Sequence, residues 1–367
     1  MLKITNKLRF KYLVAKKSFG FSIEVMENIY EMYLNHKKII HYRDGFPVYS
    51  MSIPSLFSKP SIKLFSKLSF RLVSNRNLPI LMSLAVSDIC NADCYHCSYF
   101  NGMHHEDKKK LDLEELRKVI HSGQQLGVSV LNFVGGEPLL RKDINEIIKC
   151  VDKDLSTTVI FTNGWALKEK AAGLRKAGLD GVYVSIDSAD KDTHDKLRNT
   201  PGIYEKAIDG IKTALETGMT VGISCCLSKE AYLRGDFDKI VELGKKLNIH
   251  EIIVFDQIPC GKLKECKDEL KNNDWIDDLI ESSKKYNKND KYPGILVYSY
   301  TTSYKSTGCA GGKNYLYVAP HGDVCSCDFN SKSYGNVREA PLNKIWEKMS
   351  SEKEEGYSDW CSCMLRE

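Results

Sequence analysis

The sequence predicts an α/β protein whose centre is a partial (β/α)6 barrel of parallel strands. A mainly helical, basic extension covers residues 1–79, the barrel covers 80–300, and a small cysteine-rich domain covers 301–367. Three observations support this division. Strands and helices alternate only after residue 80, positive charge gathers before it, and cysteines concentrate again near the end.

Short runs rich in β-branched residues alternate with longer runs of helical spacing along the middle of the chain. A glycine stands at or near the end of three of the predicted helical runs, at Gly127, Gly178 and Gly218, as is expected where a helix ends. The alternation predicts parallel strands, whose carboxyl ends are where ligands bind. The predicted strands are 81–86, 128–134, 157–161, 181–186, 220–225 and 251–255. The predicted helices are 113–126, 144–151, 167–177, 204–216 and 237–247.

Composition places the chain among globular proteins, since 42% of its residues are hydrophobic and 28% are charged. No run approaches the roughly 18 apolar residues that a membrane-spanning helix needs. The first residues also lack the apolar centre of an export signal, so we expect a cytoplasmic protein. In that compartment the 13 cysteines are better explained by metal or redox sites than by disulfides.

Residues 1–80 carry a net charge of +10, whereas the remainder carries −5. Within this basic head, the run 61–73 projects Lys63, Lys67 and Arg71 onto one helical stripe, and leucines and Phe65 onto the other side. Such a helix is typical of contact with a membrane surface, so we expect the protein to be peripheral at the membrane. Packing of the helix against the barrel is the alternative. Nucleic acid is not expected as a partner, because the aromatic residues form no stacking platform.

A loop with three cysteines follows the first predicted strand. Cys90, Cys94 and Cys97 are spaced so that their thiolates converge on one inorganic centre, and thiolates suit iron-sulfur clusters or zinc. Three ligands leave one metal position open for a substrate or cofactor. The alternative is a structural zinc site completed by a histidine from this region, with candidates His96, His104 and His105.

A glycine-rich turn, Gly135-Gly136-Glu137-Pro138, follows the second predicted strand. Two glycines allow backbone groups to approach a ligand, and the carboxylate can pair with an ammonium group. Taken alone, this turn is only the end of a strand. Its position one strand after the cysteine loop makes the pair of motifs a specific signal.

This pair of motifs resembles the radical S-adenosylmethionine superfamily over about residues 80 to 260. The resemblance implies that Cys90, Cys94 and Cys97 bind a 4Fe-4S cluster whose fourth iron is chelated by S-adenosylmethionine. It implies that the turn of Gly135, Gly136 and Glu137 holds the methionine ammonium. One departure is His96, which stands where the family usually has a larger aromatic residue.

Polar residues at the ends of later strands match further positions of this family. Asn163, Ser185 and Asp187 lie where the family contacts the ribose and the methionine, although such residues are also common in turns. Arg198 resembles the arginine with which this family binds the S-adenosylmethionine carboxylate. The alternative interpretation is that Arg198 is a solvent-exposed arginine on a helix. The resemblance implies a 5'-deoxyadenosyl radical that abstracts hydrogen from an unactivated C–H bond. No protein acid or base is required for this step, so no catalytic side chain is assigned.

A second set of cysteines marks the last third of the chain. The run 315–324 predicts a hairpin with a glycine turn, between Cys309 and the pair formed by Cys325 and Cys327. With Cys361 and Cys363, this pattern resembles the auxiliary-cluster extension called SPASM, or its shorter twitch form. The resemblance implies one auxiliary 4Fe-4S cluster, held by Cys309, Cys327, Cys361 and Cys363. Cys325 competes with Cys327 as a ligand, and a zinc ribbon is the alternative site.

These inferences predict a radical enzyme, an oxidoreductase or a former of C–C bonds, that acts on a lipid or another membrane-associated molecule. A low-potential donor such as flavodoxin or ferredoxin is expected to supply its electrons. The enzymatic alternatives are maturation of a ribosomal peptide and oxidation of a small alcohol. A non-catalytic zinc-binding module is the alternative of another class. The adjacent Cys225 and Cys226 point to opposite faces of one strand, which places one of them in the barrel lumen.

Overall fold

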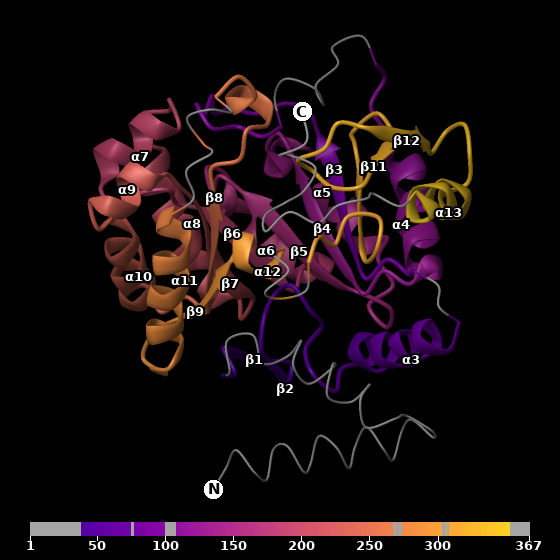
Figure 1. Ribbon diagram of the computed structural model, residues 1–367, viewed down its shortest axis with the longest axis horizontal. Helices are drawn as coiled ribbons and strands as arrows, with labels where there is room; N and C mark the ends of the chain where they lie inside the picture. The colour runs from indigo at the N-terminus through magenta and orange to yellow at the C-terminus, as the bar shows by residue number, and fades with distance from the viewer. Residues whose placement is uncertain are drawn as a thin grey trace, which may run out of the picture.

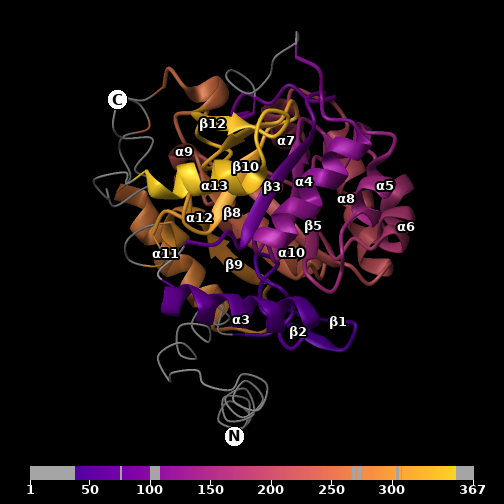
Figure 2. The same ribbon diagram turned by 90° about the vertical axis from the view of Figure 1, so that its right-hand side faces the viewer.

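The computed structural model describes residues 38–74, 77–99, 108–266, 270, 274–302, 306 and 308–352. Its centre is a ten-stranded sheet with the strand order β12-β11-β10-β3-β4-β5-β6-β7-β8-β9 (Figures 1 and 2). The six predicted strands are confirmed as adjacent, parallel strands: β3 (Leu81–Ser87), β4 (Val130–Gly135), β5 (Thr157–Thr162), β6 (Gly181–Ser185), β7 (Thr220–Leu227) and β8 (Glu251–Asp256).

The sheet extends beyond the prediction at both edges. The short strand β9 (Gly294–Val297) adds in parallel to β8. At the other edge β10 (Tyr315–Val318) adds in parallel to β3, and β11 (Asp323–Cys325) and β12 (Ser333–Asn336) follow in antiparallel order. The predicted hairpin is confirmed: Gly322 has φ +97° in the β10–β11 turn. The boundary expected at residue 300 remains a prediction, but one continuous sheet crosses it.

Helices pack on the outer face of the sheet and bury its alternate apolar residues in the main core. The five predicted helices are confirmed as α4 (Leu113–Leu126), α5 (Ile144–Lys149), α6 (Leu167–Ala177), α8 (Ile203–Glu216) and α10 (Asp236–Lys246). Their start signals are local: Asp112 and Glu115 form a reciprocal capping box at α4. After β3, the other described helices are α7 (Lys191–Leu197), α9 (Lys229–Leu233), α11 (Asp274–Asn287), α12 (Tyr298–Thr301) and α13 (Leu342–Ser351), and two 3-10 turns are η1 (Pro138–Leu140) and η2 (Gly261–Leu263).

The described part of the N-terminal extension closes the amino end of the barrel. A small hairpin, β1 (His41–Arg43) and β2 (Phe46–Val48), leads to Met51, which is 1% exposed. Met51 packs with Val159, Tyr183, Ile253 and Leu296, which come from four different strands. The sheet therefore curves around this side chain, and the described part of the extension contains this hairpin as well as a helix.

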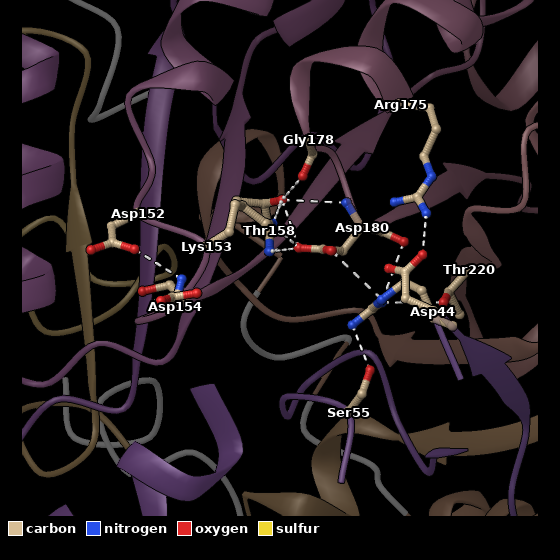
Figure 3. Close-up of polar contacts among 12 residues, drawn as sticks. Asp44, Ser55, Asp152, Lys153, Asp154, Thr158, Arg175, Gly178, Asp180 and Thr220 are labelled. Carbon is tan, nitrogen blue, oxygen red and sulfur yellow. Dashed lines mark hydrogen bonds and ion pairs between the residues drawn. The ribbon is translucent and has the colours of Figure 1, made fainter. Parts of the chain in front are cut away.

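Buried polar contacts fix this closure (Figure 3). Arg43, 5% exposed, pairs with Asp180 and donates to Ser55 Oγ at 2.7 Å and Thr220 Oγ1 at 3.2 Å. Glu251 accepts from the Met51 backbone N–H at 2.9 Å. Each buried charge thus has a partner at this end, as a stable interior requires.

The basic helix predicted over 61–73 is observed as α3 (Lys59–Ser74). Its Leu64 and Phe65 are buried, and the Lys67 ammonium donates to the Gln124 carbonyl at the end of α4. Packing against the barrel, the alternative interpretation, thus accounts for these apolar residues. The membrane contact remains a prediction. Among the described helices, none has the length and apolar character needed to cross a membrane.

Candidate active site

The three cysteines of the predicted cluster lie on one loop at the carboxyl end of β3. Cys94 is buried with Ala92 and Ile203, and Cys90 and Cys97 pack against the same apolar group. The Cys97 backbone N–H donates to the Cys94 carbonyl at 3.3 Å, which tightens the turn between the second and third cysteine. The fold therefore places the three cysteines on one loop around a shared apolar group.

Donors surround two of these sulfur atoms. The Ala92 N–H lies 3.4 Å from Cys90 Sγ, and Arg198 Nη1 lies 3.7 Å from Cys94 Sγ. Burial raises the pKa of the Cys90 thiol to about 12 and also raises that of Cys94. A metal centre would displace these protons, and the N–H donors would then stabilise the thiolates.

The two glycines of the turn after β4 allow the cysteine loop to lie directly on it. A Cβ atom on Gly135 would stand 2.1 Å from the Ser87 carbonyl oxygen, and one on Gly136 would stand 2.4 Å from that of Ile89. Gly135 also has φ +133°, which other residues rarely adopt. Backbone hydrogen bonds join the two segments, from Gly136 to Ser87 and from Glu137 to Ile89. Any side chain here would displace the loop that carries Cys90.

The Glu137 side chain is 1% exposed and already has three donors. Its carboxylate accepts from Thr162 Oγ1 at 2.6 Å, from the Asn163 N–H at 2.7 Å and from the Leu139 N–H at 2.9 Å. Burial raises the pKa of Glu137, and these hydrogen bonds oppose the increase. The carboxylate therefore ties the turn after β4 to the turn after β5. Its predicted contact with an ammonium group remains a prediction.

Asp187 and Arg198 form a buried ion pair above the end of β6. Arg198 Nε donates to Asp187 Oδ2 at 2.7 Å, and the two side chains are 11% and 0% exposed. Burial opposes ionisation of Asp187, but the adjacent Arg198 guanidinium lowers its pKa below the ordinary value. The alternative of an exposed helix arginine is wrong. The guanidinium bridges the carboxylate to the Cys94 sulfur, so it lies beside the cysteine loop.

Asn163 and Ser185 follow β5 and end β6. The Asn163 amide donates to Asn91 Oδ1 at 2.8 Å on the cysteine loop and stands 4.0 Å from Cys90 Sγ. Ser185 is half-buried and pairs with Ser224 across the sheet. Asn163 thus touches the predicted cluster loop, whereas Ser185 remains at the strand end. Their contacts with S-adenosylmethionine remain predictions.

Three residues that we did not assign to the site complete the Asp187 network. His96 Nε2 lies 3.4 Å from Asp187 Oδ2, His194 Nδ1 accepts from the Asp187 N–H at 3.1 Å, and the Cys226 N–H donates to Asp187 Oδ1 at 2.9 Å. Burial lowers the pKa of His194 to about 4 and also lowers that of His96, so both rings are neutral near pH 7. The helical position of His194 predicts only that its side chain lies on a buried face. No local signal in the sequence indicates that the ring contacts Asp187.

Aromatic side chains line the inner face of the sheet below this network. Phe161 stacks on Tyr183 with ring centroids 4.7 Å apart, and Phe255 lies 4.8 Å from Tyr298 and 6.2 Å from Phe329. Since the helices cover the opposite face, these rings border the barrel lumen. An apolar or aromatic group fits such a lining.

The auxiliary cysteines are described in part. Cys325 and Cys327 are 3% and 4% exposed, and Cys325 packs with Tyr317 on the side of the sheet that faces Cys97. The segment after Cys309 reaches them, because a Cβ atom placed on Gly311 would stand 3.2 Å from the Ser326 carbonyl oxygen. Cys361 and Cys363 lie outside the described residues. Which cysteines are ligands remains a prediction.

Comparison with known families decides the class. A model described as the Radical SAM superfamily matches residues 84–258, and one described as an iron-sulfur cluster-binding domain, SPASM, matches residues 309–364. This chain belongs to the radical SAM superfamily. The result confirms the family, the SPASM extension and an enzyme, and it decides against the non-catalytic zinc module.

Similar proteins span this family. An AdoMet-dependent heme synthase of Methanosarcina barkeri is 29% identical over 75% of this chain and 84% of its own length. A probable GTP 3',8-cyclase of Methanocella arvoryzae is 34% identical over 38% of this chain and 44% of its own. Among solved structures, Streptococcus suis SuiB bound to precursor peptide SuiA has a TM-score of 0.62 and 17% identity, covering 83% of this chain and 73% of SuiB. At this identity the likeness shows the fold.

Family membership implies a 4Fe-4S cluster, S-adenosylmethionine and auxiliary iron-sulfur binding. The donor set at the cysteine loop fits the first cluster: three sulfur atoms on one loop, with N–H and guanidinium donors beside them. In their present positions, no three His, Cys, Asp or Glu side chains of the described ranges are grouped so as to hold a metal ion. Cys90, Cys94 and Cys97 are the residues that would hold the cluster.

Proposed function

We propose that this radical SAM enzyme cleaves S-adenosylmethionine reductively and abstracts hydrogen from an unactivated C–H bond in its barrel lumen. When bound, the cluster and S-adenosylmethionine supply the 5'-deoxyadenosyl radical. The observation that carries this proposal is the convergence of the cysteine loop with the buried pair of Asp187 and Arg198. Cys90, Cys94 and Cys97 would hold three irons and leave the fourth open for the amino acid part of S-adenosylmethionine.

Each neighbouring residue has a structural task in this proposal. Gly135 and Gly136 hold the cysteine loop against the sheet. Asp187 fixes the orientation of Arg198, whose remaining guanidinium nitrogen would bind the methionine carboxylate. Asn163 and Ser185 would bind the ribose and methionine moieties. The closure at Met51 excludes water from the lumen below, which protects a reactive radical.

The proposed substrate presents an apolar or aromatic group to the lumen, and a peptide side chain is the first candidate. The aromatic lining supports this, and so does the fold likeness to SuiB, which was solved with a precursor peptide. A lipid is less supported than the basic helix alone suggested, because Leu64 and Phe65 of that helix are buried in the protein. The SPASM region would hold one auxiliary 4Fe-4S cluster, through Cys309, Cys327, Cys361 and Cys363.

The first test is anaerobic reconstitution with iron and sulfide, followed by reduction with dithionite in the presence of S-adenosylmethionine. We expect 5'-deoxyadenosine and methionine, measured by mass spectrometry, from the parent protein and not from the Cys90→Ala variant. A reconstituted protein that binds iron yet forms no 5'-deoxyadenosine would contradict the proposal.

The second test concerns the substrate. Peptide and lipid extracts of cells that make the parent protein are compared by mass spectrometry with extracts of cells that make Cys90→Ala. Loss of hydrogen from a peptide supports the peptide proposal, whereas the same change confined to lipids contradicts it. Transfer of deuterium from a labelled substrate into 5'-deoxyadenosine then identifies the C–H bond that is attacked.

A further inference from the structure

The cysteine loop extends across the carboxyl end of the sheet, from β3 to the segment that follows β8. Near its start, the backbone of Cys90 lies against the turn after β4. Further along, the Asp93 and Tyr95 N–H groups donate to the carbonyls of Arg198 and Leu197 at the end of α7, at 3.2 and 3.4 Å. Because β4, β5, β6 and β7 lie between β3 and β8 in the sheet, the loop spans the mouth of the barrel.

Backbone contacts hold the third cysteine against the segment after β8. The Lys262 N–H donates to the Cys97 carbonyl at 2.9 Å. Gly261 comes so close that a Cβ atom on it would stand 2.1 Å from the same carbonyl oxygen and 2.6 Å from the Ser98 backbone. Gly261 also has φ +55°, a left-handed conformation that favours glycine. Any side chain at this position would therefore displace Cys97.

Two side-chain contacts join the same segments. The Lys262 ammonium pairs with the Asp93 carboxylate, and the Gln257 amide donates to the Tyr95 hydroxyl. The side chain of Asp93 is 68% exposed, so the ion pair alone contributes little. Gly261 is buried, and its close backbone contact is the stronger restraint on the loop.

We propose that Gln257, Gly261 and Lys262 form a clamp that positions Cys97 over the mouth of the barrel for cluster binding. This inference rests on the proposed function, in which Cys97 holds one iron. The turn after β4 positions Cys90, whereas the clamp positions Cys97 from the other side of the mouth. The clamp residues are positioning residues, because they act on the cluster through the backbone of its third ligand.

The first test measures how fast iodoacetamide alkylates each cysteine of the purified full chain without its cluster, by mass spectrometry that assigns every modified cysteine. Gly261→Ala should expose Cys97 and raise its alkylation rate about tenfold, while the rate at Cys90 stays within about twofold of the parent. The matched control is Gly235→Ala, which should change neither rate. Gly235 has φ +77°, so both alanines carry left-handed strain, but no described atom beyond its chain neighbours lies within 4 Å of the added Cβ.

A second readout follows the cluster itself. After anaerobic reconstitution, iron loss to an external chelator should be about tenfold faster from Gly261→Ala than from the parent or Gly235→Ala, and the electron paramagnetic resonance signal of the reduced cluster should shift. Lys262→Met keeps the glycine and is the milder variant, with iron loss about threefold faster. The double variant of Lys262→Met and Asp93→Asn should lose iron no faster, because both changes remove the same ion pair.

The outcomes separate positioning from general loss of stability. The urea midpoint of Gly261→Ala should match that of Gly235→Ala. An unchanged alkylation rate at Cys97, or an equal rise at Cys90 and Cys97, would overturn the proposal. If Gly261→Ala does not fold, an unchanged rate of iron loss from Lys262→Met would overturn it. Failure of the reconstituted parent to form 5'-deoxyadenosine would instead contradict the proposed function, and the alkylation comparison would still stand because it uses no cluster.

Discussion

The two ends of the barrel are built from the same strands but differ in how many of their buried polar atoms have hydrogen-bond or ion-pair partners. At the amino end, both oxygens of Asp180 are occupied, by Arg43 on one side and by Lys153 and Thr158 on the other (Figure 3). At the carboxyl end, His96 Nδ1 and His194 Nε2 in the Asp187 network are buried without a partner in the described part of the chain, whereas at the amino end one histidine atom, His41 Nε2, shares that state.

This contrast shows where the fold is stabilised and where it is prepared to bind. A buried polar group without a partner costs about 1–3 kcal/mol, so such groups persist where a ligand satisfies them or where function requires them. The amino end therefore supports the barrel, and the carboxyl end is completed by its cofactors and substrate. Four predictions test this division, from the largest expected effect to the smallest.

Replacing Cys94 with alanine should reduce 5'-deoxyadenosine formation by at least about a thousandfold, because the cluster loses one of three protein ligands. The measurement is dithionite-driven cleavage, together with the iron content of the protein. Cys150→Ala, at the end of α5, is the matched control and should keep both. Equal losses in the two variants would remove the distinction between site and scaffold.

Replacing Arg43 with methionine should lower the free energy of unfolding by about 3 kcal/mol, because it leaves the buried Asp180 short of one cation. Urea unfolding provides the measurement. The matched variant Arg175→Met breaks an ion pair with Asp44, whose side chain is 62% exposed, and should cost less than about 1 kcal/mol. The folded fraction of Arg43→Met should cleave S-adenosylmethionine at the parent rate, and a loss of cleavage would show that the amino end also shapes the site.

Replacing Arg198 with methionine should weaken S-adenosylmethionine binding about thirtyfold, or about 2 kcal/mol, since the charge-assisted contact of its remaining guanidinium nitrogen with the carboxylate is lost. Calorimetry on the reconstituted protein gives the dissociation constant. Arg198→Lys keeps the charge without the planar fork, so it should recover only part of the affinity. Unchanged affinity in Arg198→Met would assign Arg198 to holding Asp187 and Cys94 alone.

Replacing Glu115 with glutamine should have the smallest effect, and it should depend on pH. Hydrogen bonds from Arg338, against a smaller effect of burial, lower the pKa of Glu115 to about 2, below the unfolded value of about 4.3. Its contribution to stability, about 1 kcal/mol, is therefore present above pH 4.3 and is lost as the pH falls toward 2.

Urea midpoints of the parent protein and Glu115→Gln should thus differ near neutral pH and converge in acid. Glu114→Gln, on the same helical turn and paired with Arg117, is the control and should show no such convergence. A constant difference between parent and Glu115→Gln across this range would contradict the ionic origin of the contact.

The sequence was sufficient to predict the strands β3 to β8, because apolar periodicity and glycines at helix ends are local signals. It also identified the cysteine loop and the turn at Gly135 from spacing. It did not reveal that β10 pairs with β3, since parallel pairing between distant segments leaves no local trace.

Other parts of the site depend on the assembled fold in the same way. His96, His194 and Cys226 meet Asp187 from three different elements, so no spacing predicts their contact. Glu137 was identified from the glycine-rich turn motif. The motif did not predict that its carboxylate accepts hydrogen bonds from Thr162 and Asn163 at the end of the neighbouring strand. The closure by Met51 also lies outside any motif.

The pairing of β10 with β3 has a consequence for biosynthesis. The Tyr315 hydroxyl meets Ser83 Oγ across a separation of 232 residues, so β3 leaves the ribosome long before its partner exists. During that interval the backbone edge of β3 that β10 later covers is unpaired and open to pairing with other chains. We therefore expect a chain truncated before residue 308 to aggregate when expressed, and chaperone binding during translation to favour the segment around β3.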